Sequence, residues 1–170
     1  SVNWAKFKLV IAYSTEVKID PLLSPFNIGK IMNLDEFTIE QIRGLVSTYN
    51  LSWSDDMISE LRQMIGGHPY LVRKALYEFA LGRIKNIKQL ISTAAYSNGP
   101  FGDHLRRYSW NFKEEPELAQ SMKRILMNEN CGNTDNCNKL RDIGLVKQVV
   151  RKFEPRFKIY KEYFRKTLNI

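Results

Sequence analysis

The pattern of apolar positions separates a short N-terminal stretch with β character from a longer helical remainder. Residues 7–13, FKLVIAY, form an apolar and β-branched run that is typical of a buried strand in a parallel sheet, and residues 30–34, KIMNL, predict a second short strand. Two parallel strands need further neighbours and cover on both faces. We therefore expect residues 1–37 to be the terminal strands of a truncated α/β core.

From Thr38 onward the apolar positions follow a helical period. Thr38 and Gln41 form a capping box, which is a start signal for a helix. The next helix ends at Gly66-Gly67, where the chain can turn without a Cβ penalty, and Pro69 can open the one after it. With two further helices along the chain, residues 38–113 are predicted to form a helical bundle.

The last third of the chain combines helices with a β-hairpin. Pro116 opens a helix, and Thr134 is predicted to cap another that stops at Gly144. The segments LVKQVV and FEPRFKIY flank a basic pair in the pattern of a hairpin, and the amphipathic YKEYFRKTL closes the chain. The order helix, helix, two-stranded wing, helix predicts a winged-helix domain over residues 114–170. The expected fold class is mainly α with a small β component.

Composition adds that the chain is globular, because 44% of its 170 residues are hydrophobic and 26% are charged. No run approaches the roughly 18 apolar residues that span a bilayer, and no secretory cleavage site follows the first residues. We therefore expect a cytoplasmic protein with no membrane partner. Cys131 and Cys137 are expected to be free thiols, with a disulfide as the alternative. Two cysteines and two distant histidines make a poor zinc set, so no metal site is expected.

The net charge of +8 is concentrated at the C-terminal end, where residues 139–170 contain 10 Lys/Arg and 3 Asp/Glu. Such an excess fits a nucleic-acid-binding face, a solvated surface or a face that docks on acidic protein. The residues available to a DNA-binding winged helix are Lys139, Arg141, Lys147, Arg151, Lys152, Arg156 and Lys158. Inward-facing Leu140 and Ile143 leave few positions to read bases. A third possibility is self-association through an exposed sheet edge.

No complete catalytic machinery is visible in the sequence, so the chain by itself is not expected to be an enzyme. A phosphate-binding loop would read G-x-x-x-x-G-K-[ST], but Gly29-Lys30 is followed by Ile31 and lacks the upstream glycine. Asp55-Asp56 lies in the first turn of a helix, where capping explains it. The stretch IGGHPYLVRKAL either joins two helices or exposes backbone donors to a ligand, and its spacing leaves both interpretations open.

Several segments in fixed order carry a family resemblance. They are LVIAYSTEV, SPFNIGKIMNLDEFTIEQI, IGGHPYLVRKAL, DHLRRYSWN and LRDIGLVK, followed by a basic hairpin and YKEYFRKTL. Together they resemble the C-terminal half of the AAA-like domain family, bacterial signal-transduction ATPases of the STAND class. The resemblance covers nearly the whole chain. It implies the last strands of a nucleotide-binding core, a helical lid over residues 38–113 and a winged helix over residues 114–170, with the phosphate loop and magnesium-binding segment upstream.

The resemblance also implies a set of nucleotide-contacting residues. Ser14 and Thr15 take the place of a sensor element near the γ-phosphate, while Gly67, His68 and Pro69 match a turn that packs on the adenine and ribose of ADP. Arg73, one helical turn further, is a candidate phosphate partner. The implied function is that of a regulatory portion, which closes over ADP or ATP held by the upstream core. Its implied partners are that core and the other domains of the parent protein. This chain alone is not expected to bind nucleotide tightly.

Overall fold

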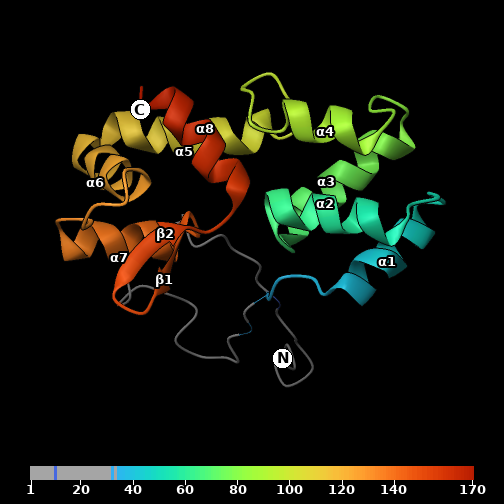
Figure 1. The fold of residues 1–170 in the computed structure, drawn as a ribbon, viewed down its shortest axis with the longest axis horizontal. Coiled ribbons are helices and arrows are strands. Elements are labelled where there is room, and N and C mark those ends of the chain that lie inside the picture. Colours follow the sequence, from blue (N-terminus) through green and yellow to red (C-terminus); the bar gives the residue numbers. More distant parts are fainter. Residues whose placement is uncertain (1–9, 11–31, 33) are drawn as a thin grey trace, which may run out of the picture. The chain divides into compact units, whose positions relative to one another are not determined.

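Eight helices and one two-stranded sheet make up the part of the chain that the structure, a computed structural model, describes: residues 10, 32 and 34–170 (Figure 1). In chain order they are α1 (Ile39–Thr48), α2 (Asp55–Ile65), α3 (Pro69–Ala80), α4 (Ile87–Thr93), α5 (Gly102–Glu114), α6 (Pro116–Leu126), α7 (Thr134–Asp142), β1 (Val146–Val149), β2 (Lys152–Pro155) and α8 (Lys158–Thr167). The prediction of a mainly α fold with a small β component is confirmed. The predicted N-terminal strands lie outside the described residues, apart from single positions, as do Ser14 and Thr15.

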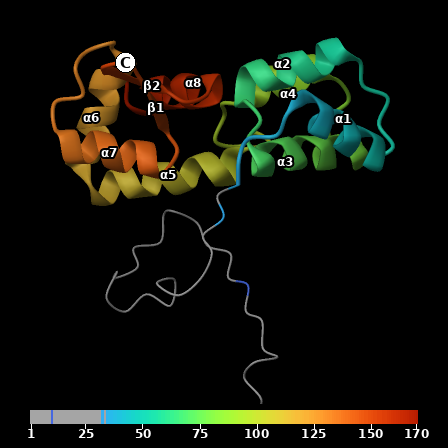
Figure 2. The same ribbon diagram turned by 90° about the horizontal axis from the view of Figure 1, so that it is seen from below.

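The first four helices pack through aliphatic side chains, and their ends follow the signals in the sequence. Thr38 and Gln41 form the expected capping box at the start of α1. Gly66 ends α2, and Pro69 occupies the first turn of α3. Figure 2 shows α1–α4 gathered on one side and α6, α7 and the hairpin on the other. The largest fully buried side chains of this bundle are Ile42, Ile58, Leu61, Met64, Ile65, Leu71, Leu76 and Leu90.

The C-terminal elements follow the predicted order, with two shifted boundaries. Strands β1 and β2 pair antiparallel from Val146 opposite Pro155 to Val149 opposite Lys152. The cap of α7 is Asn133 rather than Thr134, because its side chain accepts hydrogen bonds from the amides of residues 135 and 136. The end of the segment FEPRFKIY is helical rather than extended. Its apolar residues continue into α8, where the buried positions 159, 160, 163 and 164 have helical spacing.

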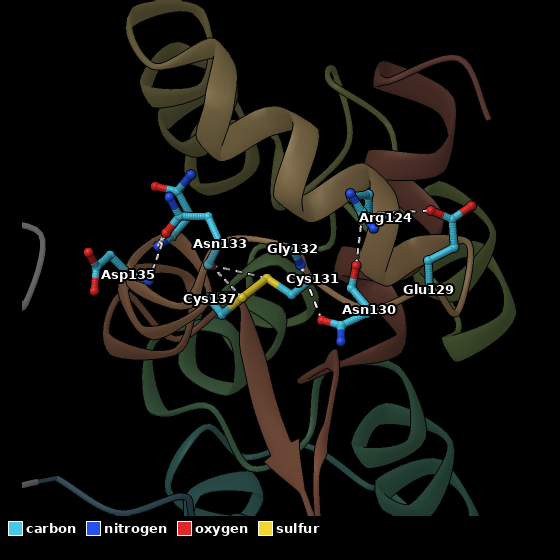
Figure 3. Close-up of a disulfide and its surroundings, with 9 residues drawn as sticks. Arg124, Glu129, Asn130, Cys131, Gly132, Asn133, Asp135 and Cys137 are labelled. Carbon is cyan, nitrogen blue, oxygen red and sulfur yellow. Dashed lines mark hydrogen bonds and ion pairs between the residues drawn. A yellow bond between two sulfur atoms is a disulfide. The ribbon is translucent and has the colours of Figure 1, made fainter.

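Cys131 and Cys137 form a disulfide, so the prediction of free thiols is wrong (Figure 3). The polar loop after α6 turns back at Gly132 and Asn133, which brings the two α-carbons to 6.1 Å, within the range that a disulfide needs. Both cysteines are buried. The disulfide therefore links the loop after α6 to the first turn of α7.

Neither a membrane-spanning helix nor a cluster of metal ligands occurs among residues 10, 32 and 34–170. No described helix combines the length and the apolar character that a bilayer crossing requires. No three described His, Cys, Asp or Glu side chains come together as metal ligands.

Candidate functional site

The turn between α2 and α3, residues 66–68, leaves no room for a side chain at its first two positions. Gly66 has a φ of 61°, and a Cβ there would lie 2.2 Å from Cε1 of the Phe157 ring. A Cβ on Gly67 would lie 2.3 Å from the backbone oxygen of Phe37. The two glycines therefore allow the turn to approach two segments that are remote in the sequence, residues 34–37 and the start of α8.

Both backbone groups of Gly67 are paired within the chain. Its N–H donates to Oε2 of Glu36 at 2.9 Å, and its carbonyl accepts from the N–H of Phe37 at 2.7 Å. Gly67 is buried as well. Of the two interpretations of this stretch, the exposure of backbone donors does not hold at Gly67 in this structure: a ligand reaches that N–H only by displacing Glu36. The carboxylate lies at the N-terminal end of α3, where a helix favours negative charge.

The same carboxylate also reaches the C-terminal part of the fold. Oε1 of Glu36 accepts from Nε and Nη2 of Arg156, at 3.1 and 3.0 Å. Burial raises the pKa of Glu36, but the Gly67 hydrogen bond and the Arg156 guanidinium outweigh it, so that pKa is lowered from its ordinary value. Glu36 is thus held as an anion between the α2–α3 turn and the residue that links β2 to α8.

Behind the turn lies a cluster of aromatic side chains that includes both histidines. The ring of His68 is 5.3 Å from that of His104 and 5.9 Å from that of Phe157, and Nε2 of His104 is 2.9 Å from the hydroxyl oxygen of Tyr160. Burial lowers the pKa of His104 to about 3, with the charges of His68 and Arg107 adding to the effect. Burial, followed by the charge of Arg156, also lowers the pKa of His68. Both imidazoles are therefore neutral at pH 7, and this cluster joins α3, α5 and α8.

The remaining predicted residues of this region have different surroundings. Pro69 occupies the first position of α3 and is half-buried, and no side chain caps this helix. Arg73 is exposed and forms no ion pair with a described residue. It shares the outer face of α3 with the exposed rings of Tyr70 and Tyr77. The structure therefore places Gly67, His68 and Pro69 at the junction with Glu36, and places Arg73 on an open helix face.

A cleft of about 410 Å³ lies beside the turn. Its lining residues come from four segments and are Glu36, Arg62, Gln63, Gly66, Lys147, Arg156, Phe157 and Lys158. Four of them are basic and one is acidic, which gives the cleft a formal charge of +3. Sequence reasoning missed the part that Glu36, Arg62 and Phe157 play here. No local signal could have found them, because the contacts of Glu36 with Gly67 and Arg156 span 31 and 120 residues.

The seven basic residues that were considered for nucleic acid do not share one set of surroundings. Three of them, Lys147, Arg156 and Lys158, line the cleft. Lys139 is paired with Glu115 and Arg141 with Asp142. The other two lie at the exposed end of the hairpin. This distribution does not favour a DNA-binding face.

The model of a family described as an AAA-like domain matches residues 1–166. No curated protein and no solved structure matches the chain significantly.

Proposed function

Since the chain belongs to the AAA-like domain family, which indicates a nucleotide-binding, ATPase-related role, we propose that it is the regulatory portion of a STAND-class nucleotide switch. In this proposal α1–α5 are the helical lid, and α6, α7, the hairpin and α8 are the winged helix. They close over ADP or ATP held by a phosphate-binding core upstream. The family match over nearly the whole chain is the observation that carries the proposal.

The element order and the junction at Gly67 support this assignment. The order α6, α7, β1, β2, α8 is helix, helix, hairpin, helix, as in a winged-helix domain. The α2–α3 turn contacts residues 36 and 37 on one side and Phe157 on the other. A ligand at this turn would therefore act on the lid, on the segment that enters it and on the winged helix together.

The proposed switch follows from a difference in affinity between two states. A nucleotide shifts such an equilibrium only as far as it binds one state more tightly than the other. For a nucleotide held by the core, the contacts of adenine and ribose with His68 and Pro69 form only when the core approaches the turn, so they favour the closed state. The 170-residue chain contains no phosphate-binding loop motif. By itself, therefore, it binds nucleotide weakly and does not hydrolyse ATP.

Amide shift mapping by NMR tests the adenine contact directly. Titration of the labelled chain with ADP at millimolar concentration is expected to shift the amides of His68, Tyr70 and Leu71, and GDP is expected to shift them less. His68→Ala should reduce these shifts, whereas Asn98→Ala, in the exposed turn before α5, should leave them unchanged. Equal shifts with both nucleotides, or shifts absent from residues 66–73, would refute the adenine contact.

A further inference from the structure

We propose that the cleft beside the α2–α3 turn binds a di- or triphosphate anion, and that this anion takes the place of the Glu36 carboxylate. Assigning these phosphates to a nucleotide, rather than to free pyrophosphate, rests on the proposed function. The cleft volume of about 410 Å³ falls within the size range of small-molecule sites.

Positive charge is concentrated around the cleft. Arg62 comes from α2, Lys147 from β1 and Lys158 from α8, and Arg156 lies between β2 and α8. Glu36 is the one acidic residue among the residues that line the cleft. Like charges brought together from separate elements repel one another and destabilise the fold, while a concave positive surface raises the local concentration of anions. A bound anion would remove that repulsion.

The side chains of Arg62 and Lys147 form no hydrogen bond or ion pair with a described residue, although the charge of Arg62 helps to lower the pKa of Glu36 and of Glu40. Nε of Arg62 is buried without a hydrogen bond in the described part of the chain, which is a costly state for a donor. Lys147 forms no ion pair with any described residue. Lys158 is paired with Glu162 at 3.6 Å, but both side chains are exposed, and such pairs contribute little. The cleft therefore holds donors that a phosphate could use without breaking existing contacts.

The carboxylate of Glu36 is an anion already bound at the edge of the cleft. It accepts from the Gly67 N–H and from two nitrogens of Arg156, all within 3.1 Å. Phosphate oxygens accept the same kinds of hydrogen bond, and arginine pairs readily with phosphate through two parallel N–H groups. A phosphate group can replace the carboxylate at both partners, whereas the two anions cannot occupy one place together.

The exchange gives two mutually exclusive arrangements. With Glu36 in place, residues 34–37 are fastened to both the turn and Arg156. With phosphate in place, the anion itself links the turn to Arg156, and residues 34–37 keep the backbone hydrogen bond from Phe37 to Gly67 and the packing of the Phe37 ring against the core. The bound anion would thus break the hydrogen bonds by which the Glu36 side chain holds the segment that enters the lid.

Calorimetric titration of the 170-residue chain with pyrophosphate, at low salt, tests the site. We expect Arg62→Gln and Lys147→Gln each to weaken binding about fivefold, which corresponds to about 1 kcal/mol for one lost charge contact. Lys88→Gln, which removes an exposed lysine from α4, is the matched control and should leave the affinity unchanged. Glu36→Gln should strengthen binding about fivefold, because the amide oxygen can still accept from Gly67 but the competing charge is gone.

Several results would overturn the proposal. These are absence of pyrophosphate binding at millimolar concentration, equal affinities for wild type, Arg62→Gln and Lys147→Gln, or weaker binding by Glu36→Gln. Thermal unfolding of each variant, followed by circular dichroism, verifies that the tested proteins are folded. Titration with ADP identifies the source of the phosphates: tighter binding than pyrophosphate supports a nucleotide, and equal binding supports the free anion.

The two proposals can fail separately. If ADP shifts the amides of His68 and Tyr70 while the cleft variants bind pyrophosphate like wild type, the cleft proposal is refuted and the switch remains. If pyrophosphate binding depends on Arg62 and Lys147 while ADP and GDP act alike at the turn, the adenine contact is refuted and the anion site remains.

Discussion

Two connections between helices, the α2–α3 turn and the α6–α7 loop, are stabilised in opposite ways. Both contain a glycine with positive φ, Gly66 at 61° and Gly132 at 91°. The α6–α7 loop is held by its own residues and by the neighbouring end of α6: a disulfide across six positions, the Asn133 cap and a hydrogen bond from Arg124 to the Asn130 carbonyl at 2.8 Å (Figure 3). The α2–α3 turn is held by residues far away in the sequence, Glu36 and Phe157.

The α6–α7 loop therefore contributes to stability locally, whereas the α2–α3 turn couples distant segments of the fold. A loop closed by its own residues can be strengthened or weakened without moving the rest of the fold. A turn held by two remote segments changes together with them, so a ligand bound there affects all three. This contrast is our reason for placing the functional junction at Gly66–Pro69 and for regarding the α6–α7 loop as structural.

The largest expected effect comes from filling the space over Gly66. Gly66→Ala combines a left-handed backbone conformation with a Cβ 2.2 Å from the Phe157 ring, so a loss of about 3 kcal/mol in unfolding free energy is expected. Gly82→Ala is the control, because Gly82 has a φ of 66° but open space around it, and should cost about 1 kcal/mol. Urea unfolding measures both losses. Equal losses of unfolding free energy would show that the contact with Phe157 does not contribute.

Removal of the disulfide is expected to cost about 2 kcal/mol through the greater freedom of the unfolded chain. The double variant Cys131→Ser, Cys137→Ser should show this loss in urea unfolding. Its affinity for pyrophosphate should equal that of wild type, because the loop is closed locally. A change in that affinity would contradict the distinction between the two connections.

Acid sensitivity is expected to come from the cluster behind the turn. The folded-state pKa of His104 is about 3 against an ordinary value of 6.5, so the unfolded chain binds the extra proton first. The stability contributed by neutral His104 is complete above pH 6.5 and is lost as the pH falls from 6.5 toward 3, by about 2 kcal/mol at pH 5. His104→Gln should flatten this part of the pH profile in urea unfolding. An unchanged profile would contradict the assignment.

The smallest expected effect is at the cap of α7. Asn133→Ala removes the acceptor for two amides at the start of the helix and should cost about 1 kcal/mol. Asn136→Ala, which keeps the cap, should be close to neutral. Both should leave pyrophosphate binding unchanged. A cap variant that alters this binding would contradict the conclusion that the α6–α7 loop is held locally.

The helices were predictable because their signals lie within a few residues of each end. Thr38 with Gln41 and Pro69 after the two glycines are examples that the structure confirms. The start of α8 was missed because a short apolar run fits both a strand and a first helical turn, and only the burial of Tyr160 beside Phe164 decides between them. Tertiary packing supplied that information.

The candidate site was predictable only where it is contiguous in sequence. The run of Gly67, His68 and Pro69 could be recognised by its turn chemistry and by resemblance. The partners Glu36 and Arg156 could not, because charged residues in those positions carry no periodic or spacing signal and their contact spans 120 residues. The disulfide was missed for a related reason, since two cysteines six residues apart fit either redox state.

The backbone hydrogen bond from Phe37 to Gly67 has a mechanical consequence. Leu34–Phe37 leads into the helical unit, but the hydrogen bonds of Glu36 and Phe37 join it to Gly67, just before α3, and to Arg156, just before α8. Tension applied to the chain ahead of Leu34 would be carried first by helices α3 and α8. The order in which force travels through this protein therefore differs from the order in which its residues are joined.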